Sequence, residues 1–175
     1  RPDLLEPVAE ACRRAGLAKV KTVIAGGATR QASVALGLAA LSAPALAAVQ
    51  DGARPFVTPE LIDRVVRAAN AYGAAAPAVP VRDTIKVARG GLVERTPDRS
   101  ALAAVQTPQV FEASLIRAAL EKAVADGETL TDDCAAVERI GMKVSLTRGD
   151  RENIKLTTPF DLMVGEAIIR QREGY

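Results

Sequence analysis

The chain has 175 residues, a formal net charge of +2 and 49% apolar residues, which suits a core-forming domain and gives no bulk attraction to nucleic acid or to a membrane. No apolar run is long enough to span a bilayer, nothing resembles a signal peptide, and Cys12 and Cys134 lie far apart in helical patterns, so we expect free thiols and a cytoplasmic protein. The absence of His excludes His-based triads, imidazole general bases and most zinc catalysis, and leaves chemistry such as phosphoryl or nucleotidyl transfer, which works with carboxylates, Lys, Arg, hydroxyls or a bound metal.

The N-terminal part of the chain has the order strand, glycines, helix. A short apolar strand is predicted over Val20–Ala25, the pair Gly26-Gly27 follows, and a helix is predicted over Gln31–Leu41. This order is typical of a phosphate or nucleotide cradle, because backbone N–H groups at a helix start point at the phosphate; an ordinary tight turn is the alternative. Arg30 and Ser33 lie one helical turn apart, so both are placed to face a ligand.

A second polar loop follows the predicted buried strand Ala45–Val49 and precedes a helix with Thr58 as its N-cap. Asp51 and Arg54 therefore lie at the carboxyl end of a strand, where open α/β sheets bind ligands. Gly52 between them lets the backbone approach whatever they hold. A carboxylate beside a guanidinium suits a metal-bound phosphate, since Asp holds Mg²⁺ and Arg matches phosphate oxygens in a fork. A structural pair that stabilises the turn is the alternative.

The segment 84–104 departs from the alternation of strands and helices. Gly90-Gly91 is predicted to turn a hairpin between Ile85–Val87 and Leu92–Glu94. An isolated hairpin is marginally stable in water, so we expect a projecting arm that packs on another subunit of a homodimer. An ordinary surface hairpin is the alternative.

The whole pattern predicts an α/β fold with a doubly wound, mostly parallel sheet, in a single domain over 1–175. The sequence starts at Arg1 without an initiator Met, so we expect that an N-terminal part is missing. Helices are predicted over 3–15, 31–41, 59–72, 112–125, 132–140 and 158–173, and strands over 20–25, 45–49, 74–81, 85–87, 92–94, 103–106 and 143–147.

Several polar clusters fall where predicted strands end, and the loops at one edge of a parallel sheet converge. Their cations and hydroxyls suit a substrate with several phosphates. Four polar residues also have a plainer interpretation: Asp83 as a turn cap, Lys86 as a solvated arm residue, Thr107 as a turn residue before Pro108, and Thr131 as an N-cap only. The clusters are 26–30, 51–54, 83–86, Thr107 and 153–155.

Six motifs in order resemble those of the 2-C-methyl-D-erythritol 4-phosphate cytidylyltransferases, and the resemblance covers nearly the whole chain. They are Gly-Gly-Ala-Thr-Arg-Gln-Ala-Ser-Val (26–34), Asp-Gly-Ala-Arg-Pro-Phe (51–56), Val-Arg-Asp-Thr-Ile-Lys (81–86), Gln-Thr-Pro-Gln-Val-Phe (106–111), Thr-Asp-Asp (131–133) and Gly-Asp-Arg-Glu-Asn-Ile-Lys (149–155). The resemblance implies a Rossmann-like nucleotidyltransferase fold, Mg²⁺ as cofactor, a homodimer, and transfer of CMP from CTP to methylerythritol phosphate with release of pyrophosphate.

The resemblance also implies roles for individual residues. Asp51 would contact the metal and the substrate phosphates, Lys155 would neutralise charge on the reacting phosphates, and Arg99 would reach across the dimer from the arm. These three form the expected catalytic set. The nucleotide would be held by Gly27, Arg30, Ser33, Asp51, Gly52 and Arg54, and the acceptor by Asp51, Thr84, Arg99, Thr107, Thr131 and Lys155.

Three departures from the family pattern leave alternatives open. The glycine-rich N-terminal loop, with an Arg and a Lys that act on the CTP phosphates, has no counterpart here, which keeps a non-catalytic dimerising relative in view. Gln50 and Gly52 replace a His and an Ala, and Phe160 stands where the family has an acid. A ribitol-phosphate cytidylyltransferase shares the nucleotide half of the site, whereas an NAD-binding domain is excluded because the G-x-G-x-x-G spacing is absent.

Overall fold

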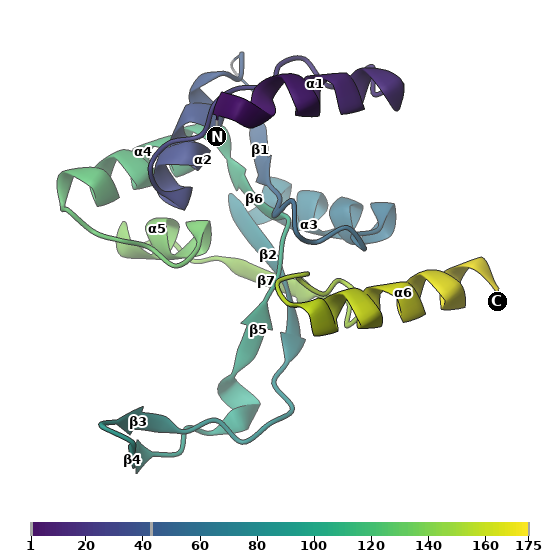
Figure 1. The fold of residues 1–175 in the computed structure, drawn as a ribbon. Helices are drawn as coiled ribbons and strands as arrows, with labels where there is room; N and C mark the ends of the chain where they lie inside the picture. The colour runs from purple at the N-terminus through teal and green to yellow at the C-terminus, as the bar shows by residue number, and fades with distance from the viewer. Residues whose placement is uncertain (1, 43, 175) are drawn as a thin grey trace.

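The computed structural model describes residues 2–42 and 44–174. A central sheet carries helices on both faces, and a two-stranded arm projects from it (Figure 1). In chain order the elements are η1 (Pro2–Leu4), α1 (Leu5–Arg14), α2 (Arg30–Ala39), β1 (Leu46–Val49), α3 (Pro59–Tyr72), β2 (Ala74–Pro80), β3 (Val87–Arg89), β4 (Leu92–Arg95), η2 (Arg99–Ala101), β5 (Ala103–Val105), β6 (Gln109–Glu112), α4 (Ala113–Ala125), α5 (Asp133–Arg139), β7 (Ser145–Arg148) and α6 (Pro159–Glu173).

The sheet is mostly antiparallel, so the predicted mostly parallel sheet is wrong. Strand β6 pairs antiparallel with β1 and with β2, β5 pairs antiparallel with β2, and within the described ranges 2–42 and 44–174 only the pair β2–β7 is parallel. The physical reason is the path of the chain after the arm. It returns along β5 and β6 beside β2, against the direction of β1, β2 and β7, and β6 fills the position between β1 and β2.

The α/β class and the helices on both faces are confirmed. Alternate residues of the central strands point to opposite faces. Phe111 of β6 packs in one core with residues of α2, α4 and α5. Its neighbour Val110 packs in a second core with Leu61 and Val65 of α3. The sheet is therefore buried on both sides, which fixes the position of the loops at its edges.

No strand forms over residues 20–25, so the strand predicted there is wrong. These residues are irregular and largely exposed. A strand needs a neighbour to satisfy its backbone N–H and C=O groups. Among the described residues, the sheet consists only of β1, β2, β5, β6 and β7, and none of these pairs with this segment.

Helix boundaries follow local capping chemistry. Thr58 caps α3 by accepting a hydrogen bond from Leu61 N, and Gly73 ends that helix in the left-handed region at φ 82°. Helix α5 differs from the prediction because Asp132, and not Thr131, is its N-cap, accepting from Ala135 N. The Thr131 side chain is thus free of the capping role.

The predicted hairpin is confirmed, with its first strand at Val87–Arg89 in place of Ile85–Val87. Gly90 and Gly91 both have positive φ, 57° and 82°, which is the geometry of a tight turn between β3 and β4. Figure 1 shows the pair β3–β4 at the far end of a neck, remote from the sheet. Leu92 and Val93 of β4 are exposed there, by 76% and 59%.

Candidate active site

The site forms around Asp51, just beyond the end of β1. Lys155 Nζ lies 2.9 Å from Asp51 Oδ2, Arg54 Nε lies 3.7 Å from the same oxygen, and Arg30 Nε lies 3.8 Å from Oδ1. The Asp51 side chain is only 16% exposed. One carboxylate therefore faces three cationic side chains from three different segments, and the excess positive charge suits an anionic ligand.

The antiparallel return of β6 still brings Thr107 to this edge. Val49 at the end of β1 pairs with Gln109 at the start of β6, so the residues just before β6 lie beside those just after β1. Thr107 is buried, and its Oγ1 accepts a hydrogen bond of 3.1 Å from Asp51 N. The hydroxyl therefore fixes the backbone that carries the central carboxylate.

A buried amide network holds the segment that carries Lys155. Gln106 accepts from Asp150 N at 3.1 Å and donates to Asp150 O at 2.6 Å. Asn153 is fully buried, and its Nδ2 donates to Thr107 O at 2.9 Å. Both ends of the loop 150–153 are therefore bonded to Gln106 and Thr107, just before β6, and these bonds fix the backbone that leads to Lys155.

Arg54 is held by the same loop. Its Nη1 donates to Asn153 O at 2.7 Å, while its buried Nε has no hydrogen-bond partner among the residues that the structure describes. Burial lowers the pKa of the Arg54 guanidinium, and the nearby Asp51 carboxylate opposes that shift. An unpaired buried donor within 3.7 Å of Asp51 is a group that a ligand or a small rearrangement can satisfy.

Arg30, predicted to face the nucleotide, is engaged elsewhere. Its Nη1 and Nη2 donate to Asp133 Oδ1 and Oδ2 at 3.0 and 2.6 Å, and this forked pair raises the pKa of Arg30. Asp133 is 1% exposed. The first turn of α5 is also bonded to β6, since Gln109 Oε1 accepts from Asp133 N and Gln109 Nε2 donates to Asp132.

Residues 26–29 before α2, here called the glycine loop, are held in shape by hydrogen bonds within the segment and to Ser33 of α2. Ser33 Oγ accepts from Gly27 N at 3.1 Å and donates to Thr29 O at 2.8 Å. A Cβ on Gly27 would lie 2.5 Å from Ala32 Cβ, so the close approach requires glycine. Gly52 is different, because a Cβ there would meet nothing within 4 Å.

These residues surround a cavity of about 170 Å³. Among the predicted site residues, the structure brings six to its lining and leaves Gly27, Ser33, Gly52, Thr84 and Arg99 outside it. The cavity is lined by Arg30, Asp51, Arg54, Val105, Gln106, Thr107, Gln109, Thr131, Asp132 and Lys155.

Thr84 and Arg99 lie in the neck of the arm and are exposed. Arg99 Nη1 donates to Arg82 O at 2.6 Å, across the two sides of the neck. Within one chain neither side chain lines the cavity around Asp51.

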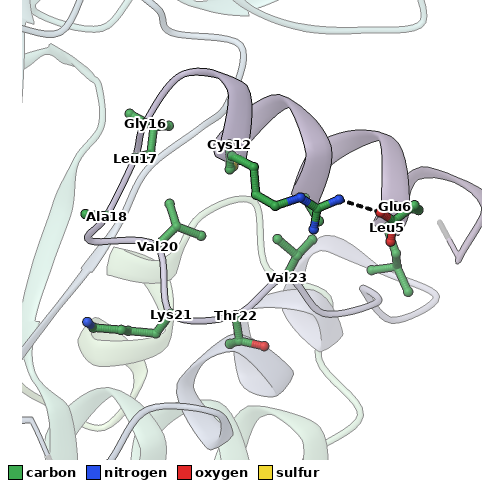
Figure 2. A pocket seen from close by; sticks show the side chains of 12 residues that line it. Leu5, Glu6, Cys12, Gly16, Leu17, Ala18, Val20, Lys21, Thr22 and Val23 are labelled. Atoms are coloured by element: carbon green, nitrogen blue, oxygen red, sulfur yellow. Dashed lines mark hydrogen bonds and ion pairs between the residues drawn. The ribbon is translucent and has the colours of Figure 1, made fainter.

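A larger cavity of about 570 Å³ lies between α1 and the irregular segment 16–23. Figure 2 shows Val20 and Val23 beneath α1. Arg13 and Glu6 also line this cavity and form an ion pair 2.6 Å long. None of the predicted site residues lines it. The charged side chains of its lining, Glu6, Arg13 and Lys21, are exposed, and Glu6 is paired with Arg13. Asp51, by contrast, is 16% exposed and faces three cations, so the smaller cavity is the better candidate for phosphate chemistry.

The donor set fits a metal held jointly with a ligand. Among the described residues, no three His, Cys, Asp or Glu side chains converge as a metal cage. Mg²⁺ is usually bound through one or two carboxylates together with substrate phosphates and waters. Two carboxylates line the cavity, and Asp132 already accepts from Gln109 Nε2 and Ala135 N, so Asp51 is the candidate for such a role.

Sequence reasoning gave no role in the site to Gln106, Gln109, Asp133 or Asn153, although it placed Asn153 in the polar cluster 153–155. All four are buried polar residues. They lie inside motifs already noted, at 106–111, 131–133 and 149–155, and a polar residue flanking a buried strand or helix was the available signal. Their partners come from distant segments, which no local pattern reveals.

Comparison with known proteins gives one consistent result. Residues 7–171 match the family model described as 2-C-methyl-D-erythritol 4-phosphate cytidylyltransferase. The enzyme of that name from Geobacillus kaustophilus is 53% identical over 154 residues, which are 88% of this chain and 68% of the relative.

Solved structures agree with this match. The cytidylyltransferase of the same name from Thermus thermophilus has a TM-score of 0.78 at 44% identity, covering 84% of this chain and 72% of that one. The 4-diphosphocytidyl-2C-methyl-D-erythritol synthase from Anaerococcus prevotii has a TM-score of 0.85 at 31% identity, covering 97% and 78%. Within the part of the chain that the structure describes, no helix combines the length and apolarity needed to cross a bilayer.

Proposed function

Because the chain belongs to the 2-C-methyl-D-erythritol 4-phosphate cytidylyltransferase family, the cytidylyltransferases of the non-mevalonate pathway, we propose that the cavity around Asp51 is its reaction site. There CMP would pass from CTP to 2-C-methyl-D-erythritol 4-phosphate with release of pyrophosphate. The observation that carries this proposal is the carboxylate of Asp51, only 16% exposed, which faces Lys155, Arg54 and Arg30.

The chemistry needs charge neutralisation more than proton transfer. A phosphate oxygen of the acceptor forms a new bond to the α-phosphorus of CTP, the bond from that phosphorus to the bridging oxygen breaks, and pyrophosphate leaves with the electron pair. A phosphate dianion has no proton to lose, so a chain without His loses nothing. Both reactants are anions, and cations fixed around the cavity offset their repulsion and stabilise the crowded phosphorus.

Two of the cationic residues, Lys155 and Arg54, differ in how they can act. Lys155 is 45% exposed, so it can leave Asp51 for a phosphate at little cost. Arg54 is more deeply buried and is held by Asn153 O, so it presents a fixed positive charge. We assign Lys155 to the reacting phosphates and Arg54, with Gly27 and Ser33 of the glycine loop, to CTP.

Mg²⁺ fits beside Asp51, with the phosphates of CTP supplying further oxygen ligands. When bound, it would withdraw charge from the phosphate oxygens and orient them. Thr107 would keep Asp51 in place for this role, since its hydroxyl accepts from Asp51 N.

The acceptor would lie toward the start of α5 and the arm of a second subunit. Thr107 and Thr131 line the cavity and offer hydroxyls to a sugar phosphate. Arg99 and Thr84 lie on the neck of the arm, away from their own cavity, so they would serve the site of a partner in a homodimer. The exposed Leu92 and Val93 at the arm's end support such packing.

The test is release of pyrophosphate from CTP and Mg²⁺, with methylerythritol phosphate and ribitol phosphate as parallel acceptors. We expect release with the first acceptor only, and its loss in Asp51→Asn. Release with ribitol phosphate alone would transfer the activity to the second acceptor. If a folded sample released no pyrophosphate with either acceptor, the proposal would be contradicted.

A further inference from the structure

Arg30 joins three segments of the site. It begins α2, directly after the glycine loop, and its two terminal nitrogens grip both oxygens of Asp133 at the start of α5. Its third nitrogen, Nε, faces Asp51 Oδ1 at 3.8 Å. The nucleotide side and the acceptor side of the cavity therefore meet at one guanidinium.

The two hydrogen bonds from Arg30 to Asp133 are costly to break. Asp133 is 1% exposed, and removing one partner of a buried charge pair leaves the other charge uncompensated. The edge of the planar guanidinium formed by Nη1 and Nη2 is occupied by Asp133, and Nε on the other edge lies 3.8 Å from Asp51 Oδ1, so both donor edges already face carboxylates. This geometry argues against Arg30 as a primary CTP ligand, the role expected from its place in the glycine loop.

The acceptor side is anchored at the same point. Gln109 Oε1 accepts from Asp133 N at 3.0 Å, so the first turn of α5 is tied to β6 as well as to α2. Thr131 lies two residues before Asp133, on the rim of the cavity. The start of α2, directly after the glycine loop, is thereby connected through Asp133 to the loop that carries Thr131.

We propose that Arg30 is a positioning residue that couples the two substrate sites. Through Asp133 it holds the loop that carries Thr131, here called the acceptor loop, in a fixed position relative to the glycine loop and Asp51. The proposal rests on the proposed function. Nucleotide that orders the glycine loop would also order the acceptor loop, so each substrate binds more tightly in the presence of the other. Such coupling is reciprocal, because it is one free energy shared by two sites.

The first test measures that coupling. Initial rates over a grid of CTP and methylerythritol phosphate concentrations give the factor by which one substrate improves the apparent affinity of the other. In Arg30→Lys, which keeps the charge but loses the fork, we expect this factor to fall by about tenfold. The affinity for CTP alone, from calorimetric titration without acceptor, should change by less than about twofold.

Two controls make the result specific. Arg139→Lys alters an exposed ion pair at the other end of α5, with Asp126 and Glu128, and should leave the coupling unchanged. Asp133→Asn keeps the shape of the side chain and should reproduce the effect of Arg30→Lys, and the double variant should be no worse than either single variant. Loss of CTP affinity without acceptor would instead make Arg30 a direct phosphate ligand and overturn the inference.

A second readout does not need activity. Amide hydrogen exchange over 131–136 should be faster by about tenfold in Arg30→Lys and in Asp133→Asn, while exchange in α4 stays as in the parent protein. If the parent protein released no pyrophosphate, the proposed function would fail while exchange still tested the tether. Unchanged exchange over 131–136 in the folded variants would overturn the inference whatever the activity.

Discussion

Lys155 Nζ and Asp51 Oδ2 lie 2.9 Å apart, and they join the segment after β7 to the segment after β1. The pair is half open to solvent on the lysine side and nearly closed on the aspartate side, with side-chain exposures of 45% and 16%. Its asymmetry suits an aspartate that stays in place and a lysine that moves onto an anionic ligand. The pair links the geometry of the sheet edge to the proposed chemistry.

Replacing Lys155 by Met should therefore affect the reaction and spare the fold. We expect kcat/KM for pyrophosphate release to fall by about a hundredfold or more, the range seen when one group that stabilises transition-state charge is removed. The thermal midpoint should change little, because a partly exposed ion pair contributes little to stability.

The matched control is Lys122→Met, which removes an exposed ion pair of similar length, 3.0 Å to Asp126, on α4. It should leave kcat/KM unchanged. Equal effects of the two substitutions, or a Lys155→Met variant with full activity, would remove Lys155 from the reacting phosphates.

How much of this could be read from the sequence depends on whether the signal was local. The bounds of α3 were predictable from Thr58, Pro59 and Gly73, because helix capping depends only on residues within a turn of the helix end. Strand direction is not local: residues 109–112 follow Pro108 and precede a helix, and only pairing with β1 and β2 makes them the antiparallel strand β6. That missed strand explains the wrong parallel sheet.

The site shows the same division. Asp51, Arg54 and Lys155 were predictable because charged residues beside strand ends carry a chemical signature, and the structure brings them together. Gln106 and Asn153 were not, because an amide becomes structural only through its partners, and these lie in other segments. No local pattern indicated that Asp133 would occupy the fork of Arg30, because their meeting depends on how the start of α5 lies against the start of α2.

Two glycines predicted to hold the nucleotide should respond differently to a methyl group. In Gly27→Ala the new Cβ would lie 2.5 Å from Ala32 Cβ, so the loop or the first turn of α2 must shift. We expect a loss of about 1–3 kcal/mol in the free energy of unfolding, measured with urea. Gly52→Ala meets open space and should change stability by less than about 0.5 kcal/mol. Equal losses would contradict this account of the glycine loop.

The capping box of α6 predicts a pH dependence of stability. Asp161 accepts hydrogen bonds from the backbone N–H groups of Thr157 and Thr158 and from the Thr157 hydroxyl, and these lower its pKa from 3.8 to about 2. Because the folded pKa is below the unfolded value, the stabilisation is complete above pH 3.8 and is lost as the pH falls toward 2.

Asp161→Asn should therefore have a lower thermal midpoint than the parent protein at about pH 7, and the difference should shrink between about pH 4 and pH 2. Scanning calorimetry of both proteins across this range measures it. Asp150→Asn is a useful comparison, since Asp150 caps only one backbone group, Glu152 N. A difference in midpoint that stays constant across the whole range would contradict the role of the ionised carboxylate.

Arg99 supplies the sharpest test of the dimer. It lies on the neck of the arm, outside the cavity of its own chain, and we place it in the site of a partner. Asp51→Asn and Arg99→Ala should each abolish most of the activity alone. In a two-fold dimer formed after mixing and re-equilibrating the two inactive variants, each heterodimer contains one site with both native residues, so about a quarter of the parent activity should return. If Arg99 acted within its own chain, every site in the mixture would lack one residue, and mixing would restore nothing.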